Sequence, residues 1–239
     1  MTTAPLLTVI DETDDLLVVN KSAGLVCHPS KDGERSSLVG RVRLYLEHAE
    51  GRLVNRLDRE TSGVVLIAKS ASVAGELGKL LAAGRTVEKR YDAIVHGTVA
   101  AELVIDAPLG KDEHSEIAIK NCVRTDGAAA RTDVRPIRAL EHDGRAFSLL
   151  DVRPHTGRKH QIRIHLAHAG HPIVGDKLYG DDEQRYLRFV RRTLTPADLE
   201  ALLLENHALH ARHLSFEWRG RARRFECDAP EAFQGFLSG

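Results

Sequence analysis

Residues 55–69 read Asn-Arg-Leu-Asp-Arg-Glu-Thr-Ser-Gly-Val-Val-Leu-Ile-Ala-Lys, a polar stretch followed at once by an apolar one. Short, partly β-branched apolar runs bounded by polar or glycine residues are typical of buried strands, which predicts a strand over 64–68. Asp58 then lies in a polar turn just before a central strand. Taken alone, an aspartate in such a turn is more often a capping residue than a catalytic one.

The rest of the chain alternates similar apolar runs with amphipathic stretches. Further strands are expected over residues 16–19, 93–95, 131–140, 145–152 and 208–218. Helices are expected over residues 36–48, 70–83 and 159–169, the last of them closed by Gly170. Because these strands and helices lack a steady β-α-β order, the sequence favours an α+β fold.

Composition and charge set limits on the kind of protein. The 239 residues are 42% hydrophobic and 28% charged, which is enough to enclose a core. No repeat or linker interrupts the sequence, so a single domain is expected over residues 1–239. The 34 Lys and Arg residues equal the 34 Asp and Glu residues in number, so any binding of nucleic acid must depend on local charge.

The cysteines and the amino terminus indicate the cellular compartment in which the protein is expected. Cys27, Cys122 and Cys227 are widely separated and form no paired motif, which favours a reducing environment with the cytoplasm as the default. The first residues form no basic leader, and no apolar run approaches the roughly 20 residues that a membrane-spanning helix needs. A cytoplasmic protein without membrane association is therefore expected.

Residues 181–206 form an arginine-rich segment, for which two helices are predicted over 181–194 and 196–204, the second capped by Thr195. The arginines at i, i+3 and i+7 are Arg185, Arg188 and Arg192. An arginine stripe is somewhat more often a solvated helix face than a binding surface. The alternative is contact with RNA phosphates, whose geometry suits guanidinium groups.

Three further stretches carry chemically active side chains. Residues 88–97, Glu-Lys-Arg-Tyr-Asp-Ala-Ile-Val-His-Gly, place Tyr91 near the start of a strand pattern. Residues 153–167 read Arg-Pro-His-Thr-Gly-Arg-Lys-His-Gln-Ile-Arg-Ile-His-Leu-Ala, and residues 170–180 read Gly-His-Pro-Ile-Val-Gly-Asp-Lys-Leu-Tyr-Gly.

Together with residues 55–63, these stretches occur in the order that is characteristic of the RluA family of RNA pseudouridine synthases, which the chain resembles from about residue 16 to about residue 230. The resemblance implies the pseudouridine synthase fold: a mixed, mainly antiparallel sheet, flanking helices and a central catalytic cleft. It also implies an isomerase that acts on uridine within ribosomal or transfer RNA without a cofactor. The base would leave the ribose at N1, turn while bound, and rejoin through C5.

The resemblance implies three catalytic residues, Asp58, Tyr91 and Arg163. Asp58 would act as a nucleophile or as a base on the sugar. A carboxylate closed over by a base loses solvation and needs a cation, and the family pattern gives that role to Arg163. Tyr91 would lie against the target base and transfer a proton, although a strand tyrosine without these motifs is more often a core residue.

The target uridine must be extruded from the RNA before it can react. Arg56 matches a position that fills the gap left in the RNA stack, and a surface salt bridge is an equally weighted alternative for it. The other residues expected to contact RNA are Arg158, Lys159, His160, Gln161, Arg185, Arg188 and Arg192. RNA is the expected partner, and a monomer is the default expectation.

Two positions depart from the family pattern: Asn55 stands where histidine is common, and Ser22 stands where proline is common. Neither is one of the catalytic residues that the resemblance implies, so both are expected to affect the choice of substrate more than the activity. Thr61, Ser62 and Gly63 are expected to shape the turn around Asp58. No separate amino-terminal RNA-binding module is expected.

Two other interpretations are weaker. The thirteen histidines suggest a metal hydrolase, but their three-residue spacing does not aim them at one ion and no HExxH motif is present, so no metal is expected. A non-catalytic RNA-binding or chaperone protein of the same fold is the second alternative. The neutral net charge and the joint presence of Asp58, Tyr91 and Arg163 favour the enzyme.

Overall fold

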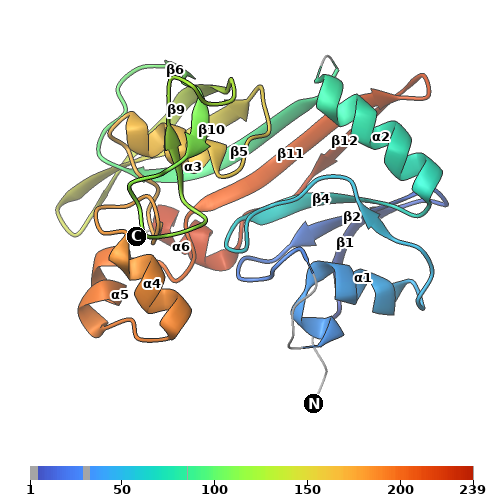
Figure 1. The fold of residues 1–239 in the computed structure, drawn as a ribbon, viewed down its shortest axis with the longest axis horizontal. Helices are drawn as coiled ribbons and strands as arrows, with labels where there is room; N and C mark the ends of the chain where they lie inside the picture. The colour runs from blue at the N-terminus through green and yellow to red at the C-terminus, as the bar shows by residue number, and fades with distance from the viewer. Residues whose placement is uncertain (1–4, 29–32, 85, 239) are drawn as a thin grey trace. The chain divides into compact units, whose positions relative to one another are not determined.

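The strand predicted after Asp58 is β4 (Ser62–Ala68), and every one of its residues is buried. A computed structural model describes residues 5–28, 33–84 and 86–238. Its contacts divide the chain into unit 1, Met1–Lys89 with His210–Pro230, and unit 2, Arg90–Leu209 with Glu231–Gly239. Most elements of both units are labelled in Figure 1. A single domain over residues 1–239 stays a prediction.

Unit 1 is built on strands in the order β1-β2-β4-β11. Strand β12 pairs with β11, and the short β3 pairs with β4. All of these pairs are antiparallel except β4 with β11, which is parallel. The bounds are β1 (Thr8–Glu12), β2 (Leu16–Lys21), β3 (Arg52–Leu53), β11 (Leu209–Trp218) and β12 (Arg221–Glu226).

The helices of unit 1 begin at serine caps. The hydroxyl of Ser37 caps α1 (Leu38–Tyr45), which follows the short 3-10 helix η1 (Glu34–Ser36), and the hydroxyl of Ser70 caps α2 (Ala71–Ala83). Helix α2 packs Val73 and Leu77 into the core of β2, β4 and β11. The helix predicted over 36–48 is shorter in the structure, since Glu47 and His48 take left-handed conformations.

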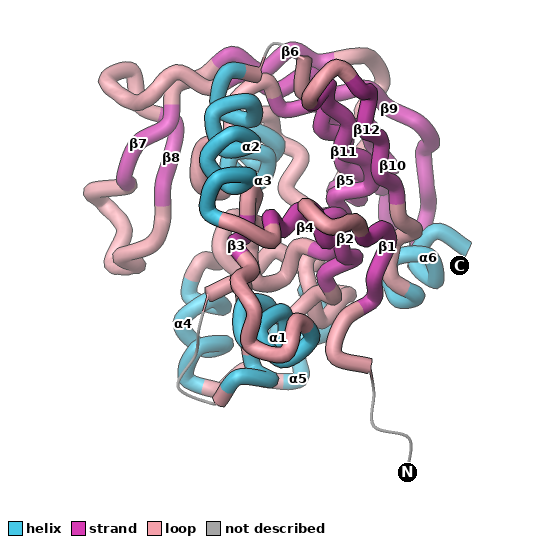
Figure 2. Tube along the Cα trace, turned by 90° about the vertical axis from the view of Figure 1, so that its right-hand side faces the viewer, coloured by secondary structure: helices cyan, strands magenta, loops and turns pink. Residues whose placement is uncertain are grey.

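Unit 2 contains a second set of antiparallel strands in the order β5-β10-β9-β6. Figure 2 shows the separate hairpin β7–β8 at a distance from β9 and β10, with α3 between them. The bounds of these elements are β5 (Glu88–His96), β6 (Leu103–Asp106), β7 (Leu109–Lys111), β8 (Asn121–Val123), β9 (Arg131–His142), β10 (Arg145–Pro154) and α3 (Gln161–His168).

The remaining helices are α4 (Gln184–Arg191), α5 (Pro196–Leu202) and α6 (Glu231–Ser238). Thr195 caps α5 as predicted, in a capping box with Asp198. Helix α4 begins three residues later and ends three residues earlier than the predicted 181–194. It ends because Arg192 takes a left-handed conformation (φ 61°), so the prediction that Arg192 shares a helix face with Arg185 and Arg188 is wrong.

Most of the other predicted elements are confirmed. The predicted strands correspond to β2, β4, β5, β9, β10 and β11, and the predicted helix 70–83 corresponds to α2. The helix predicted over 159–169 begins at Gln161, and Gly170 follows its end with a φ of 84°. Mixed, mainly antiparallel strands with flanking helices confirm the α+β class. Over the described residues, no helix is long and apolar enough to span a membrane.

Candidate active site

Asp58 is half-buried in the loop between β3 and β4, and side chains on both sides of it fix this loop. Before Asp58, the amide of Asn55 donates to the carbonyl of Val64 at 3.2 Å and accepts from the N–H of Leu66 at 2.8 Å. The Asn55 side chain therefore pairs with β4 much as another strand would. At this departure from the family pattern, asparagine has a structural role.

Lys21, at the end of β2, was not singled out from the sequence and is buried next to this loop, with 1% of its surface exposed. Its ammonium donates to the carbonyl oxygens of Ser22 at 2.9 Å, Leu25 at 2.9 Å and Arg59 at 3.0 Å. Lys21 thus joins the loop after β2 to the residue that follows Asp58. Burial lowers the pKa of Lys21 to about 8, while the nearby Cys27 and Asp58 groups act to raise it.

After Asp58, the parallel pairing of β4 with β11 fixes the chain. The Ser62 hydroxyl lies 2.8 Å from Nδ1 of the buried His210, whose Nε2 lies 3.0 Å from the carbonyl of Cys227. Because a carbonyl only accepts, Nε2 carries the proton and Ser62 donates to Nδ1. Gly63 has a φ of 118°, and a Cβ there would lie 2.3 Å from the carbonyl oxygen of Ala211. Ser62 and Gly63 therefore shape this turn, as expected.

Arg56 is exposed on the same loop and donates from Nη1 to Nε2 of His28 at 2.7 Å. A guanidinium has only donors, so the ring nitrogen of His28 is the acceptor in this contact. The structure thus gives Arg56 a histidine partner, where the sequence left a surface salt bridge open. An exposed arginine held by a contact to a histidine ring can exchange that contact for one to RNA at little cost.

Tyr91 and Arg163 belong to unit 2, whereas Asp58 belongs to unit 1. Tyr91 is half-buried near the start of β5, opposite Val152 of β10. Side chains alternate between the faces of a strand, so Tyr91 shares a face of β5 with the buried Ala93. The strand pattern predicted for Tyr91 from residues 88–97 is confirmed.

Arg163 lies on α3, with 7% of its surface exposed, and makes a two-pronged ion pair with Asp176. Its Nε is 2.7 Å from Oδ2 and its Nη2 is 2.8 Å from Oδ1 of that carboxylate. The N–H groups of Leu178 and Tyr179 also donate to Oδ1, at 2.9 and 3.0 Å. Burial raises the pKa of Asp176, but the charge and hydrogen bonds of Arg163 outweigh it and hold this pKa well below its usual range.

The loop before α3 carries the next group of predicted RNA contacts. Gln161 is buried, and its amide donates to the carbonyl of Arg131 and the hydroxyl of Thr132 while accepting from Thr156 and the N–H of Arg158. These four bonds use the full capacity of the amide. Gln161 therefore supports the loop, and a direct contact with RNA stays a prediction.

Three residues of this loop differ in their exposure. Arg158 and Lys159 are exposed, and Nε of Arg158 donates to the carbonyl of Ala129 at 3.0 Å. His160 is half-buried and takes a left-handed conformation, with its Nδ1 2.8 Å from the hydroxyl of Tyr179. The exposed basic groups of this loop are thus Arg158 and Lys159.

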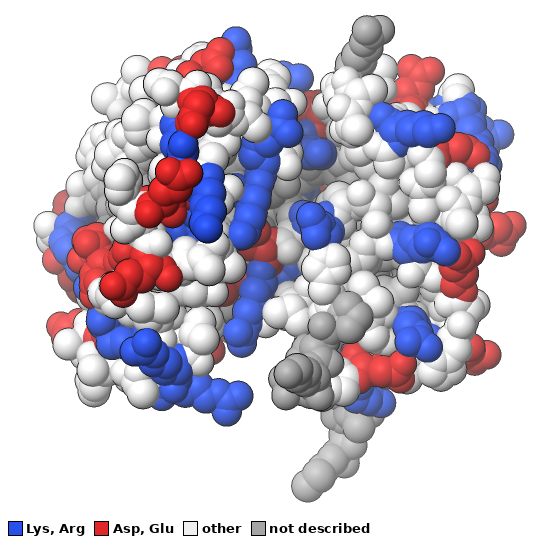
Figure 3. Space-filling model, viewed as in Figure 1, with Lys and Arg blue, Asp and Glu red and all other residues white. Residues whose placement is uncertain are grey.

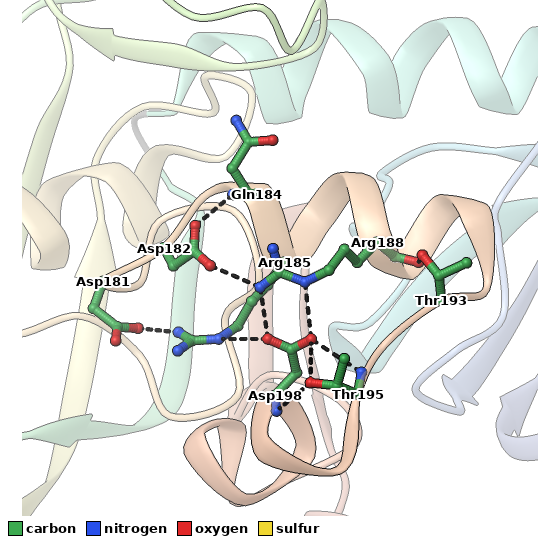
Figure 4. A network of polar contacts seen from close by, with 8 residues as sticks. All are labelled: Asp181, Asp182, Gln184, Arg185, Arg188, Thr193, Thr195 and Asp198. Carbon is green, nitrogen blue, oxygen red and sulfur yellow. Dashed lines mark hydrogen bonds and ion pairs between the residues drawn. The ribbon is translucent and has the colours of Figure 1, made fainter.

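The arginines of α4 take part in an ion-pair network with α5, drawn in Figure 4. Arg188 bonds to Asp198 through Nε at 2.8 Å and Nη2 at 2.6 Å, and its Nη2 lies 2.7 Å from Asp182. Arg185 bonds to Asp181 and lies 3.4 Å from Asp198. Hydrogen bonds from Arg188 hold the pKa of Asp198 well below its usual range. The sequence periodicity showed the arginines but not these three aspartates.

Charges of both signs lie side by side over the face of the molecule in Figure 3. This mixing agrees with the zero net charge of the sequence. Among the residues that the structure describes, no group of three or more His, Cys, Asp or Glu side chains is placed to hold a metal ion.

Lys21 and Asp176 are the site residues that the sequence reasoning did not assign. Both lie within or beside stretches already noted: Lys21 follows the apolar run 16–19 after one intervening residue, and Asp176 belongs to the stretch 170–180. A lysine two positions after four apolar residues was an available signal, since its ammonium must find acceptors once its stem is buried.

Comparison with known proteins gives consistent matches. The model of the RNA pseudouridylate synthase family matches residues 15–168. Ribosomal large subunit pseudouridine synthase D of Xanthomonas campestris pv. campestris is 35% identical over 238 residues, covering 97% of this chain and 69% of that protein. The protein of the same name from Pseudomonas aeruginosa is 34% identical over 242 residues, covering 97% and 71%.

Solved structures match over most of the chain as well. Human RNA Pseudouridylate Synthase Domain Containing 4 is 25% identical with a TM-score of 0.72, covering 97% of this chain and 92% of that one. Human RNA Pseudouridylate Synthase Domain Containing 1 is 24% identical with a TM-score of 0.75, covering 96% and 87%, and this likeness shows the fold.

Proposed function

This chain belongs to the RNA pseudouridylate synthase family, and from that premise we propose that it isomerises a uridine of structured large-subunit ribosomal RNA, with Asp58 as the essential carboxylate. Isomerisation of uridine to pseudouridine in RNA is the activity of the family. The ribosomal substrate is inferred from the relatives named ribosomal large subunit pseudouridine synthase D, which this chain matches over nearly its whole length.

The proposed reaction exchanges one glycosidic bond for another. The bond from the ribose C1′ to N1 breaks, the base turns, and a bond from C1′ to C5 forms. The hydrogen on C5 leaves as a proton and N1 gains a proton, so atoms and electrons balance without an oxidant or a reductant. We therefore propose that the chain needs no cofactor or metal ion.

Asp58, Tyr91 and Arg163 are proposed to act on the same uridine. Asp58 serves as a nucleophile or as a base on the sugar, Arg163 stabilises its negative charge, and Tyr91 lies against the base and transfers a proton. The observation that carries this proposal is the fixed loop of Asp58. Lys21, Asn55 and Ser62 hold it from three sides through backbone and side-chain hydrogen bonds. A catalytic group must be held in a defined position relative to its substrate, and these hydrogen bonds restrain the Asp58 loop in this way.

RNA contacts are proposed for exposed basic groups. Arg56 enters the RNA stack when the uridine is extruded, and Arg158 and Lys159 bind nearby phosphates. His160 and Gln161 support this loop beside them. Arg192, which is exposed after α4, is proposed as a further phosphate contact. We also propose that the protein acts in the cytoplasm as a monomer.

The experiment is a map of pseudouridine in all RNA from cells that have or lack the gene. We expect one or a few sites in large-subunit ribosomal RNA to disappear with the gene and to return when the wild-type gene is restored. Sites lost from transfer RNA instead would contradict the ribosomal assignment. An unchanged map in every RNA would contradict the catalytic assignment.

A further inference from the structure

Asp176 is a buried carboxylate to which the proposed reaction gives no role, and its surroundings fix it in place. With 3% of its surface exposed, it accepts hydrogen bonds at Oδ1 from the backbone N–H groups of Leu178 and Tyr179. These bonds close a tight turn from Asp176 to Tyr179. The carboxylate therefore has one orientation, set by the backbone, before Arg163 is considered.

The guanidinium of Arg163 meets this carboxylate along one edge. Nε and Nη2 of Arg163 bond to the two oxygens of Asp176 at 2.7 and 2.8 Å. A two-pronged contact of this kind fixes both the plane of the guanidinium and its rotation within that plane. A lysine at this position could not be oriented in this way, because its single ammonium lies at the end of a flexible stem.

Tyr179 restrains the same guanidinium from its face. The Cζ of Arg163 lies 4.9 Å from the centre of the Tyr179 ring. The tyrosine is itself fixed through its hydroxyl, which accepts from the N–H of Asn121 at 3.2 Å and lies 2.8 Å from Nδ1 of His160. Residues from β8, the loop before α3 and the turn after Asp176 thus restrain one guanidinium.

The contacts of Asp176 and Tyr179 fix the orientation of the Arg163 guanidinium. Asp176 bonds to Nε and Nη2 of Arg163, which together form one edge of the guanidinium. Nη1 is the nitrogen at the opposite corner of the planar group. Its N–H groups therefore point where Asp176 and Tyr179 orient them.

We propose that Asp176 and Tyr179 are positioning residues that fix the plane and rotation of the Arg163 guanidinium for its part in the reaction, an inference that rests on the proposed role of Arg163. Asp176 acts through Arg163 and does not touch RNA. It also balances the charge of a buried guanidinium whether or not substrate is bound, so that Arg163 needs no reorganisation when RNA arrives.

The test compares the wild-type chain with Asp176→Asn, which keeps the shape of the side chain and removes its charge. We expect kcat at saturating RNA to fall by about 10- to 100-fold, the scale of a misplaced catalytic group. The Kd for RNA should stay within about threefold of the wild-type value. A purely structural role would not separate these two quantities.

Asp151→Asn is the matched control. Asp151 is also a buried carboxylate of unit 2, and its Oδ2 accepts from Arg90 at 3.0 Å and Arg135 at 3.2 Å. Its loss removes contacts with two arginines but leaves Arg163 unchanged, so its kcat should match the wild type. Equal values of kcat in Asp176→Asn and Asp151→Asn would overturn the proposal. A loss of RNA affinity equal to the loss of kcat would also overturn it.

A second measurement covers the case in which Asp176→Asn does not fold. Asp176→Glu keeps the charge but displaces the carboxylate by one methylene, so kcat should again fall, and a wild-type kcat would overturn the proposal. The Nε–H resonance of Arg163 in NMR spectra provides a readout without activity. It should be slow to exchange in the wild-type chain and fast in the Asp176 variants, whereas equal exchange would overturn the proposal.

Failure of the proposed function and failure of the positioning role of Asp176 give different results. A wild-type chain that forms no pseudouridine in any RNA contradicts the proposed function. The exchange of the Arg163 Nε–H still decides, in that case, whether Asp176 holds the guanidinium.

Discussion

Arg188 and Asp198 join helices α4 and α5 through two hydrogen bonds, from Nε at 2.8 Å and from Nη2 at 2.6 Å. Asp198 also completes the capping box of Thr195 at the start of α5. One carboxylate therefore fixes both the beginning of α5 and its attachment to α4. Much of the positive charge that the sequence placed in this segment is neutralised inside the protein, which changes what each arginine is expected to do.

The first prediction concerns this difference among the arginines. Arg188→Ala should lower the melting temperature, because it leaves Asp198 and Asp182 without this partner. Arg192→Ala should leave the melting temperature unchanged and weaken RNA binding, with a smaller dependence of Kd on salt. Thermal unfolding and RNA titration at several salt concentrations provide the measurement. The prediction is wrong if Arg192→Ala binds RNA as tightly as the wild type.

The second prediction concerns the close approach of β4 and β11. Gly63→Ala places a Cβ 2.3 Å from the carbonyl oxygen of Ala211 at a φ of 118°, so strands must separate to admit it. The free energy of unfolding should fall by about 2 to 4 kcal/mol. Gly78→Ala in α2 is the control, since its Cβ meets nothing within 4 Å and should add about 0.5 to 1 kcal/mol. Denaturant unfolding measures both, and equal stabilities would contradict the packing described here.

The third prediction concerns pH and Lys21, whose pKa burial lowers from 10.5 to about 8. Between these values the folded chain releases a proton that the unfolded chain keeps. The free energy of unfolding therefore rises with pH over this range, by up to about 3 kcal/mol from this group, and the contribution is constant below about pH 8.

Lys21→Met removes this titration. The difference in unfolding free energy between wild type and Lys21→Met should grow as pH increases from about 8 to 10.5. Lys79→Met, on the exposed face of α2, is the control and should show a constant difference. A constant difference for Lys21→Met as well would show that burial does not affect this ammonium in the way described.

The sequence predicted those elements whose signal is local. The apolar run of β4 and the capped, amphipathic α2 were found with nearly correct bounds, because burial and capping leave their pattern in consecutive residues. The short β7, β8 and β12 and the terminal α6 were not found. Their residues become strand or helix through pairing and packing with distant segments, such as Phe236 of α6 against Phe147 of β10.

The residues of the site also fall into two groups, those that the sequence motifs identified and those that only the structure revealed. The motifs marked Asp58, Tyr91 and Arg163, but no spacing could show that Arg163 bonds to Asp176, 13 residues later in a different segment. Nor could it show that Lys21 finds an acceptor in Arg59, 38 residues away. Ion pairs and buried hydrogen bonds depend on where loops close in space, and arginine periodicity alone could not reveal the carboxylates that neutralise α4.

The most direct test of the central claim is pseudouridine formation by Asp58→Asn on the RNA that the cellular map identifies. We expect no detectable pseudouridine from this variant, with a Kd for RNA within about threefold of wild type. Asp14→Asn, at an exposed position of the same unit, should form pseudouridine at the wild-type rate. Formation of pseudouridine by Asp58→Asn at the wild-type rate would contradict the assignment of Asp58 as the essential carboxylate.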